Sequence, residues 1–556
     1  MKVKLSLISL SMVMGLGMAV LWMAVLNPSV QAAPTPELHV CPSGCPYTSI
    51  QSAVDAAQAG DVIKVTQGNY TDVHHKANLD TETFTATQVV AVTKPITIRG
   101  GYTMTNWTTP DPVALPTTLD AGGQGRVMVI SGTNSTTIEG LRMTGGDASG
   151  LGGHYSGARD AGGGVYVYSA TVIIRNCNVY SNSAHTGEWA TGSGGGMYLS
   201  SANATLESNI ISGNVGSARG HGYGGGLNLF DSHNASLKGN TISGNIGASA
   251  NGYGGGLYLY YSEYASLEDN IIRDNVGSQG ANYYGGGLYL VDSDHAILRG
   301  NLIKGNTAGA AWSWGGGVYV DRSDNVTLTG NTIEDNTAST YDGWGGGLYL
   351  RSSNDLTMSG NLFTSNAGTS NLISGESWGG GLYIERGEAM TLTNNVFADN
   401  EVTTAGSGLY IEDASPRFLH TTIARNMGGD GSGVSITGTL NTVAMTNTII
   451  VSHTVGISVS VNSTAALNFS LWHNNTSNLG GTGTVKNFNG YTGDPAFAPD
   501  GYHLAHASAA IDQGVDAGVV TDIDGDLRPR WTGYDIGADE FMRRIYLTLV
   551  MHGEQP

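Results

Sequence analysis

The chain has 556 residues, of which 83 are glycine, and its formal net charge is −20 at pH 7. Glycine is about twice as frequent as in ordinary globular domains, which indicates a chain with many turns. The strong negative charge argues against binding to nucleic acid and against unaided binding to other polyanions. Three cysteines are too few for a fold that is held together by disulfides.

The N-terminal segment predicts export. Lys2 and Lys4 precede an apolar run that extends to about Leu26, and Val30-Gln31-Ala32 ends in the small-residue pattern of a signal-peptidase site. We therefore expect residues 1–33 to be a signal peptide, and the mature protein to be secreted or displayed at the cell surface. The apolar run is also long enough to span a bilayer. An uncleaved anchor is the alternative, and the membrane would then be contacted through this segment alone.

Residues 34–145 are expected to form a cap followed by irregular first coils. Thr48 or Ser49 can cap a helix over residues 48–59, and Gly60 can stop it. A strand follows at once, from Val62 to Val65. The apolar side of the helix carries Ile50, Val54 and Ala57.

The cysteines have two different expected roles. Cys41 and Cys45 lie close together in the sequence of an exported chain, so we expect them to form a disulfide that closes a small loop. Cys177 stands apart from them, and we expect it to be a buried free thiol.

A repeat with intervals of 25 to 34 residues fills most of the region 146–490. Each copy begins with glycines that precede a short apolar strand, as in Gly254-Gly255-Gly256-Leu257-Tyr258-Leu259. A nearly fixed period of this length indicates stacked units, none of which can bury its apolar face alone. The copies begin at Gly162, Gly194, Gly224, Gly254, Gly285, Gly315, Gly345, Gly379, Gly406 and Gly431.

One unit predicts a three-sided coil. Leu257 and Leu259 alternate with Tyr258 in the first strand, Leu267 belongs to a second, and residues 270–275 contain a third strand and its turn. Three such strands need about 22 residues, so the rest of the unit must bulge out as a loop insertion. Stacked strands form parallel sheets with right-handed crossovers. The sequence therefore predicts an all-β fold, a right-handed parallel β-helix with an N-terminal α-helical cap.

Two columns of asparagine occur in register from coil to coil. Asparagine tolerates the left-handed backbone of a tight turn, and stacked amide side chains can hydrogen-bond between coils. We therefore expect two structural ladders. The first column is Asn209, Asn240, Asn270, Asn301, Asn331, Asn361 and Asn395, and the second is Asn214, Asn245, Asn275, Asn306, Asn336, Asn366 and Asn400.

Two stretches carry a family resemblance. The helix of residues 48–59 with its following strand resembles the N-terminal cap of the pectin lyase-like β-helix superfamily, in which one amphipathic helix seals the open end of the solenoid. Residues 491–541 are similar to the choice-of-anchor Q module that closes bacterial surface β-helix proteins. A tail, residues 542–556, follows with no sortase motif. The module's motifs are Gly501-Tyr502-His503-Leu504, residues 508–514, residues 522–529 and residues 534–541.

Two aromatic columns are candidate ligand-binding surfaces. Outward residues form continuous stripes because each coil rises only about 4.8 Å. Aromatic rings flanked by polar groups stack on sugars, so we expect a shallow, partly exposed groove that binds an extended polysaccharide, either neutral or calcium-bridged. The alternative is that the rings only pack on one another. The candidates are Tyr289, Tyr319, Tyr349 and Tyr383 on the strands, and Trp314, Trp344 and Trp378 before the glycines.

Charged residues just after the same strands are the best catalytic candidates. Asp321, Arg351 and Glu385 lie on three adjacent coils. In pectate lyase-like enzymes, which this fold resembles, acidic residues on such a face hold calcium against a uronate, and an Arg or Lys takes the proton alpha to its carboxylate. A charge-balanced structural stack would have the same pattern, and the sequence contains no complete catalytic motif.

The sequence requires no cofactor, although a structural calcium ion is possible near the C-terminus. Asp522, Asp524 and Asp526 alternate as calcium ligands do, but Gly525 and Gly533 do not fit an EF-hand loop. The leading hypothesis is thus an exported bacterial β-helix protein, not an enzyme, that binds polysaccharide or another surface through its aromatic face. The alternative is a polysaccharide lyase of the same fold, and the fold alone does not choose between them.

Overall fold

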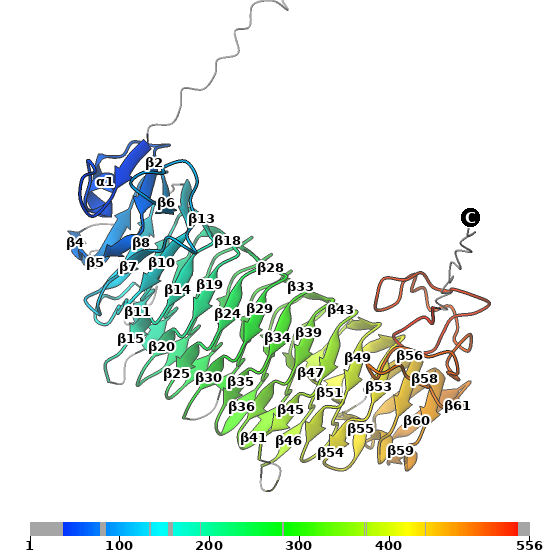
Figure 1. Cartoon of the computed structure of the whole chain (residues 1–556). Helices are drawn as coiled ribbons and strands as arrows, with labels where there is room; N and C mark the ends of the chain where they lie inside the picture. Colours follow the sequence, from blue (N-terminus) through cyan, green and yellow to red (C-terminus); the bar gives the residue numbers. More distant parts are fainter. Residues whose placement is uncertain are drawn as a thin grey trace, which may run out of the picture.

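The computed structural model of the protein describes residues 37–77, 85–132, 135–153, 159–188, 191–280, 283–371, 373, 375–439 and 441–542. The predicted signal peptide and all but the first residue of the predicted tail lie outside these residues. The described chain forms an elongated solenoid of parallel strands with a short helix, α1, at its N-terminal end (Figure 1). None of its described helices is long and apolar enough to cross a membrane.

One coil of the regular array shows how the three sides form. After Gly254-Gly255-Gly256 the chain runs through β27 (Leu257–Tyr260), β28 (Ser266–Glu268) and β29 (Ile271–Arg273). The equivalent strands of successive coils pair in parallel, so that Leu257 lies beside Leu288. Because each residue rests on its counterpart one coil away, the predicted three-sided β-helix is confirmed.

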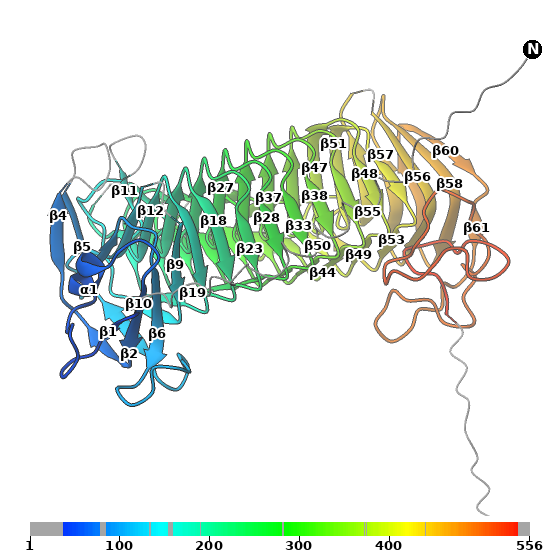
Figure 2. The same ribbon diagram turned by 90° about the horizontal axis from the view of Figure 1, so that it is seen from above.

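The coils follow one another along a single axis (Figure 2). Strands of the first side form a 15-stranded sheet, and those of the other two sides belong to a 29-stranded sheet. We call the first side the tyrosine face. In the regular array it consists of β12 (Val165–Tyr168), β17 (Met197–Ser200), β22 (Leu227–Phe230), β27, β32 (Leu288–Val291), β37 (Val318–Asp321), β42 (Leu348–Arg351), β47 (Leu382–Gly387) and β51 (Leu409–Ala414).

The inward residues of all three sides form one continuous apolar core. Leu257, Leu259, Leu267 and Ile272 are fully buried in it, as predicted. The core extends from the N-terminal cap to the last coils. Full burial of one such side chain contributes about 1.5–3 kcal/mol, so the repeated apolar rows are the main source of stability.

Both asparagine ladders are present. The Nδ2 group of Asn275 donates to Oδ1 of Asn306 at 3.0 Å and to the carbonyl oxygen of Ile242 at 2.9 Å, and its backbone N–H also donates to Asn306 Oδ1. The other ladder members repeat these contacts up to Asn395, which ends the first ladder and donates to the carbonyl oxygens of Met358 and Thr393 instead. The contacts allow a buried amide at each corner. Cys177 occupies a ladder position, where its backbone N–H donates to Asn209 Oδ1 and its thiol is free and buried.

The loop insertions form two further sheets, which the sequence did not predict. In the coil above, β30 (Val276–Ser278) leaves the solenoid and β31 (Tyr283–Tyr284) returns to it. Successive insertions have nearly equal lengths, so their backbones also stack in register and pair. We call these two sheets, with nine and eight strands, the loop layer. Its returning strands are β11 (Arg159–Ala161), β16 (Thr191–Ser193), β21 (Gly222–Tyr223), β26 (Gly252–Tyr253), β31, β36 (Trp312–Trp314), β41 (Asp342–Trp344) and β46 (Ser377–Trp378).

Glycine is required where the loop layer joins the coil. A Cβ atom on Gly252 would lie 1.6 Å from the carbonyl oxygen of Gly277, and one on Gly256 would lie 2.6 Å from that of Gly287. Gly254 in addition has a φ of +66°, a conformation that other residues adopt only with strain. The repeated glycines therefore allow backbones to approach where no side chain fits.

The N-terminal cap closes the first coil. Helix α1 (Ile50–Ala56) begins after Ser49 and buries Ile50 and Val54 against the core. Strands β1 (Glu37–Val40) and β2 (Val62–Thr66) pair in parallel beneath it. Cys41 and Cys45 form a disulfide in the loop that follows β1.

The C-terminal residues 493–542 form a module without regular strands in the described chain. They follow β58 (Thr464–His473), β60 (Thr484–Phe488) and β61 (Tyr491–Thr492), and they fold back beside the last coils (Figures 1 and 2). Ala538 packs against Val396 and Ala398 of β49 (Val396–Ala398). A buried ion pair between Arg528 and Glu540, with 2.8 Å between nitrogen and oxygen, holds the module together.

A histidine extends the second asparagine ladder beyond Asn426. The backbone N–H of Asn426 donates to Nε2 of His453 at 3.3 Å, which requires the imidazole to be neutral. Burial lowers the pKa of His453 to about 4. As pH falls below the ordinary value of about 6.5, the unfolded chain takes up a proton that the native chain does not, so acid weakens the fold.

We expect His453→Asn to remove part of this acid sensitivity. At pH 5 the lowered pKa costs the parent about 2 kcal/mol of unfolding free energy relative to pH 7, and an asparagine would continue the ladder without titrating. Urea unfolding of both proteins at the two pH values measures the difference. Burial also lowers the pKa of His420 to about 3, so His420 contributes an acid sensitivity of stability that the parent and the variant share. Equal acid sensitivity in parent and variant would contradict this role of His453.

Candidate functional site

Aromatic rings fill the region where the loop layer meets the tyrosine face. The returning strands carry a column of residues in register, which we call the aromatic column: Tyr223, Tyr253, Tyr284, Trp314, Trp344 and Trp378. These rings pack against the tyrosine stripe, which consists of Tyr258, Tyr289, Tyr319, Tyr349, Tyr383 and Tyr410. We call this region the aromatic corner.

The tyrosine stripe is the floor of the corner and is largely buried. The exposed fractions of Tyr289, Tyr319, Tyr349 and Tyr383 are only 1–7%. Neighbouring rings lie 4.7–5.0 Å apart between centroids and are tilted by 31–43°. The expectation that these four rings line an exposed groove is therefore corrected, because the loop layer and the adjacent rings cover their faces.

The aromatic column lies above the floor and is half-buried. Its indoles stack along the solenoid axis, with 4.9 Å between Trp314 and Trp344 and 5.4 Å between Trp344 and Trp378. Each inner ring is therefore stacked on both of its faces by its neighbours, so that mainly its edge is exposed. Trp378 is the last ring of the column, since the next coil presents Ala405 at this register.

Two further aromatic side chains on the loop layer are exposed. Trp312 is 54% exposed and lies two residues before Trp314 on β36, and therefore on the same face of that strand. Tyr341 is 45% exposed in the next insertion. These two side chains therefore provide aromatic surface in addition to the rings that stack within the column, which ends at Trp378.

A row of charged side chains borders the stripe on its other side. Asp321, Arg351, Glu385 and Glu412 lie in register on adjacent coils. The hydroxyl of Tyr349 donates to Glu385, and that of Tyr383 donates to Glu412. The stripe and the charged row are thus joined coil by coil.

Each acidic group among the three catalytic candidates has an arginine partner. Asp321 pairs with Arg322, which also binds both carboxylate oxygens of Asp292 at 2.9 Å. Glu385 pairs with Arg386 at 2.8 Å and lies 3.5 Å from Arg351. A calcium ion would have to compete with these arginines, so the geometry does not favour a calcium-dependent lyase site.

Arg351 is also unsuited to accept a proton. A hydrogen bond to the Tyr319 hydroxyl and the nearby charges of Glu385 and Asp321 raise the pKa of Arg351 above its ordinary value. A general base must be deprotonated at the working pH. Burial raises the pKa of Asp321, although Arg322 and Arg351 oppose that shift. The structure brings the three candidates together as a charge-balanced stack.

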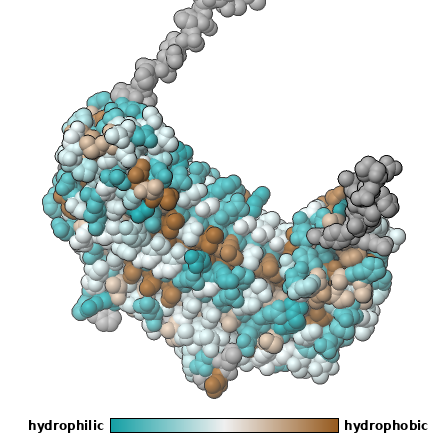
Figure 3. Space-filling view, viewed as in Figure 1, coloured by the Kyte–Doolittle hydropathy of each residue, from teal (hydrophilic) through white to brown (hydrophobic). Residues whose placement is uncertain are grey.

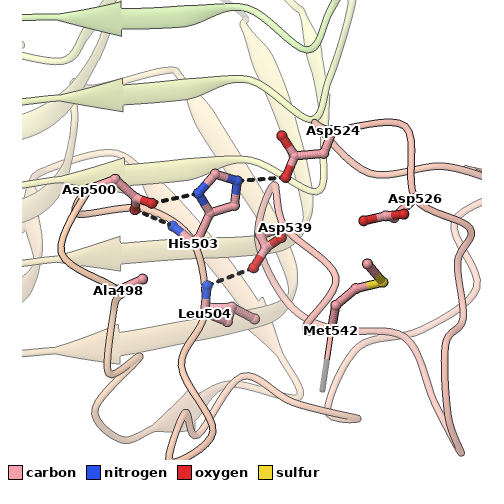
Figure 4. A pocket seen from close by; sticks show the side chains of 8 residues that line it. All are labelled: Ala498, Asp500, His503, Leu504, Asp524, Asp526, Asp539 and Met542. Atoms are coloured by element: carbon pink, nitrogen blue, oxygen red, sulfur yellow. Dashed lines mark hydrogen bonds and ion pairs between the residues drawn. The ribbon is translucent and has the colours of Figure 1, made fainter. Parts of the chain in front are cut away.

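The three aspartates near the C-terminus do not converge on one point. Oδ1 of Asp522 accepts the backbone N–H groups of Asp524 and Asp526 at 3.0 and 2.8 Å, so Asp522 shapes its own turn. Asp524 and Asp526 instead line a pocket of about 380 Å³ with residues that the sequence did not indicate as ligands (Figure 4). These are Ala498, Asp500, His503, Leu504, Asp539 and Met542.

The opposite face of the solenoid carries a sparse apolar row. Ile210 of β19 (Ile210–Ser212) and Ile271 of β29 are exposed, and Figure 3 shows apolar side chains over these strands. Further along, Leu362 packs under Tyr502 and Ile523 of the C-terminal module. This face therefore supports the C-terminal module.

Part of the surroundings of the site has a clear sequence signal. Trp312 and Tyr341 stand out as second aromatics in the loops, and Arg322 and Arg386 as neighbours of the charged row. His503 and Asp539 are 36 residues apart in irregular segments, so no spacing pattern linked them.

Comparison with known proteins identifies the family. A sequence model of the family described as "Right handed beta helix region" matches residues 124–318, 254–377 and 282–429, which together exceed half of the chain. The chain therefore belongs to the right-handed β-helix family. No curated protein matches it.

Several solved structures match the chain at low sequence identity. The mannuronan C-5 epimerase AlgE6 A-module of Azotobacter vinelandii is 13% identical, with a TM-score of 0.35 and coverage of 80% of this chain and 94% of that one. Pectate lyase Pel9A is 11% identical, with a TM-score of 0.31 and coverage of 92% and 97%. The surface adhesin PfbA of Streptococcus pneumoniae is 8% identical, with a TM-score of 0.27 and coverage of 65% and 86%.

Alkaline titration tests the burial of the stripe. Burial and the hydrogen bond to Glu385 raise the pKa of Tyr349 well above its ordinary value. Unfolded tyrosines ionise near pH 10, so higher pH favours the unfolded chain and stability falls. We expect the tyrosinate absorbance to rise in an early phase from exposed rings and in a late phase that coincides with loss of the β circular-dichroism signal. Tyr349→Phe should diminish the late phase, and a single early phase for all tyrosines would mean that the stripe is accessible.

Proposed function

We propose that the protein is an exported β-helix that binds polysaccharide at the aromatic corner. The observation that carries the proposal is the exposed side chain of Trp312, together with the half-buried Trp378 at the end of the column. The tyrosine stripe lies between these rings and the row of acidic groups paired with arginines. Aromatic faces stack on the apolar faces of sugar rings. Carboxylates accept hydrogen bonds from sugar hydroxyls, and guanidinium groups donate hydrogen bonds to them. The two features together suit an extended, uncharged glycan.

The geometry changes the expected mode of contact. The indoles of Trp314, Trp344 and Trp378 stack on one another, so a sugar ring would meet Trp312, the outer face of Trp378 and the exposed edges between them. The tyrosine stripe would not touch the ligand but would hold the column and the charged row in place. Burial raises the pKa of Tyr284, on which Arg351 and Asp321 also act, so the column lies within electrostatic reach of the charged row.

Export and surface display belong to the same proposal. The pattern of residues 1–33 and the disulfide between Cys41 and Cys45 support it, because disulfides persist mainly in oxidising compartments. Residues 491–541 would act as the closing, choice-of-anchor-like module. N-terminal sequencing of the protein from its native host would reveal whether the first segment is removed.

A glycan array followed by affinity electrophoresis tests the binding function. We expect Trp312→Ala and Trp378→Ala each to weaken retention by about tenfold, which corresponds to about 1.4 kcal/mol, and the double variant to abolish it. Tyr264→Ala is the matched control, since Tyr264 is 50% exposed but lies outside the corner.

The outcomes separate the hypotheses. Retention by both tryptophan variants at the parental level would place the ligand elsewhere, and failure of the parent to bind any glycan would refute the binding function. Ultraviolet absorbance from new unsaturated ends on uronate polymers would instead indicate a lyase.

A further inference from the structure

The imidazole of His503 is held in a fixed orientation at the C-terminal pocket. Its Nδ1 lies 2.8 Å from Oδ2 of Asp500, and its Nε2 lies 2.7 Å from Oδ2 of Asp524 (Figure 4). Asp500 is itself fixed, because its Oδ1 accepts the backbone N–H groups of Tyr502 and His503 at 3.1 Å. Histidines that bind metals commonly donate the N–H of one ring nitrogen to a carboxylate, which orients the ring so that the other nitrogen can bind the metal.

Asp539 supplies a second, independent observation. Its side chain is only 6% exposed, and its Oδ2 accepts the backbone N–H of Leu504 at 2.6 Å. Its other carboxylate oxygen accepts no hydrogen bond from the described residues, and the residue lines the pocket. A carboxylate in a largely buried residue is costly to ionise without a positive charge nearby, and a cation bound in the pocket would supply that charge.

The spacing and the charge of the pocket both suit a cation. One ligand atom from each of His503, Asp524 and Asp539 lies within 4.8 Å of the other two. Ligands of one ion at bond lengths of about 2 Å are about 3–4 Å apart, so small side-chain rotations would close the site. Asp500 and Asp526 add further negative charge, and the guanidinium of Arg530 lies 3.8 Å from Asp526.

We propose that Nε2 of His503 and the carboxylates of Asp524 and Asp539 bind a divalent cation. One imidazole nitrogen with two carboxylates favours Zn²⁺ or Mn²⁺, whereas Ca²⁺ prefers oxygen ligands alone. Binding would release the Nε2 proton and replace its hydrogen bond to Asp524. This set differs from the calcium ligands expected from the sequence, because Asp522 is engaged by its own turn and takes no part.

The ion would fasten three separate segments of the C-terminal module. His503 follows the turn at residues 498–501, Asp524 belongs to the turn at residues 522–526, and Asp539 precedes Glu540, which pairs with Arg528. These segments cover the apolar residues of β49 and β53 (Thr422–Ala424). We therefore assign the ion a structural role, in which it holds the module against the last coils.

Isothermal titration of the chelator-treated full-length protein with ZnCl₂, MnCl₂ and CaCl₂ tests the proposal. We expect Zn²⁺ or Mn²⁺ to bind one ion per chain and to raise the thermal midpoint, and Ca²⁺ to bind at least tenfold more weakly. Substitution with Co²⁺ should give visible absorption bands that report nitrogen coordination. Absence of any transition-metal binding would overturn the proposal.

Variants locate the site. His503→Gln and Asp539→Asn should each weaken binding at least a hundredfold and remove the thermal shift, while His506→Gln, an exposed histidine nearby, should behave as the parent. Circular dichroism of the metal-free variants shows whether they fold. If Asp539→Asn does not fold, Asp524→Asn tests a carboxylate ligand in its place. Binding that survives in His503→Gln, or binding of Ca²⁺ alone, would overturn the assignment.

Discussion

The architecture depends on the close approach of backbones at the triglycine turn. Here the strand that returns from the loop layer passes so near its neighbours that a Cβ atom would collide with carbonyl oxygens. Without that approach the insertions would be separate loops. With it, eight returning strands stack against the solenoid and bring the aromatic column onto the tyrosine stripe. The candidate binding surface is therefore a consequence of residues that have no side chains.

Much of the fold could be predicted because it repeats. The inward leucines, the asparagine ladders and the three strands of each coil recur at nearly fixed spacing, and any one coil supplies the interpretation of the others. The loop layer could not be predicted in the same way, because strands such as β30 and β31 have only three and two residues and lack the apolar alternation of the solenoid strands. Their hydrogen bonds appear only when equal insertions are stacked.

The sequence predicted which residues form the candidate site, but it did not predict how far their side chains are exposed. The sequence places tyrosines outward on most coils, which is correct, but it does not show that the loop layer folds over them. The sequence likewise predicted that the residues of the charged row lie on adjacent coils. It did not predict that Arg322 pairs with Asp292, which lies one coil away. At the C-terminal pocket no periodicity exists, so only the folded chain brings His503 and Asp539 together.

The stacked indoles have a spectroscopic consequence. Three tryptophans follow one another at about 5 Å with their planes nearly parallel, so their electronic transitions are coupled. Such coupling produces paired bands of opposite sign in the near-ultraviolet circular-dichroism spectrum, and it vanishes once the rings separate. The chain thus carries an intrinsic optical reporter of the loop layer, distinct from the far-ultraviolet signal of the solenoid, which allows the two to be followed separately during unfolding.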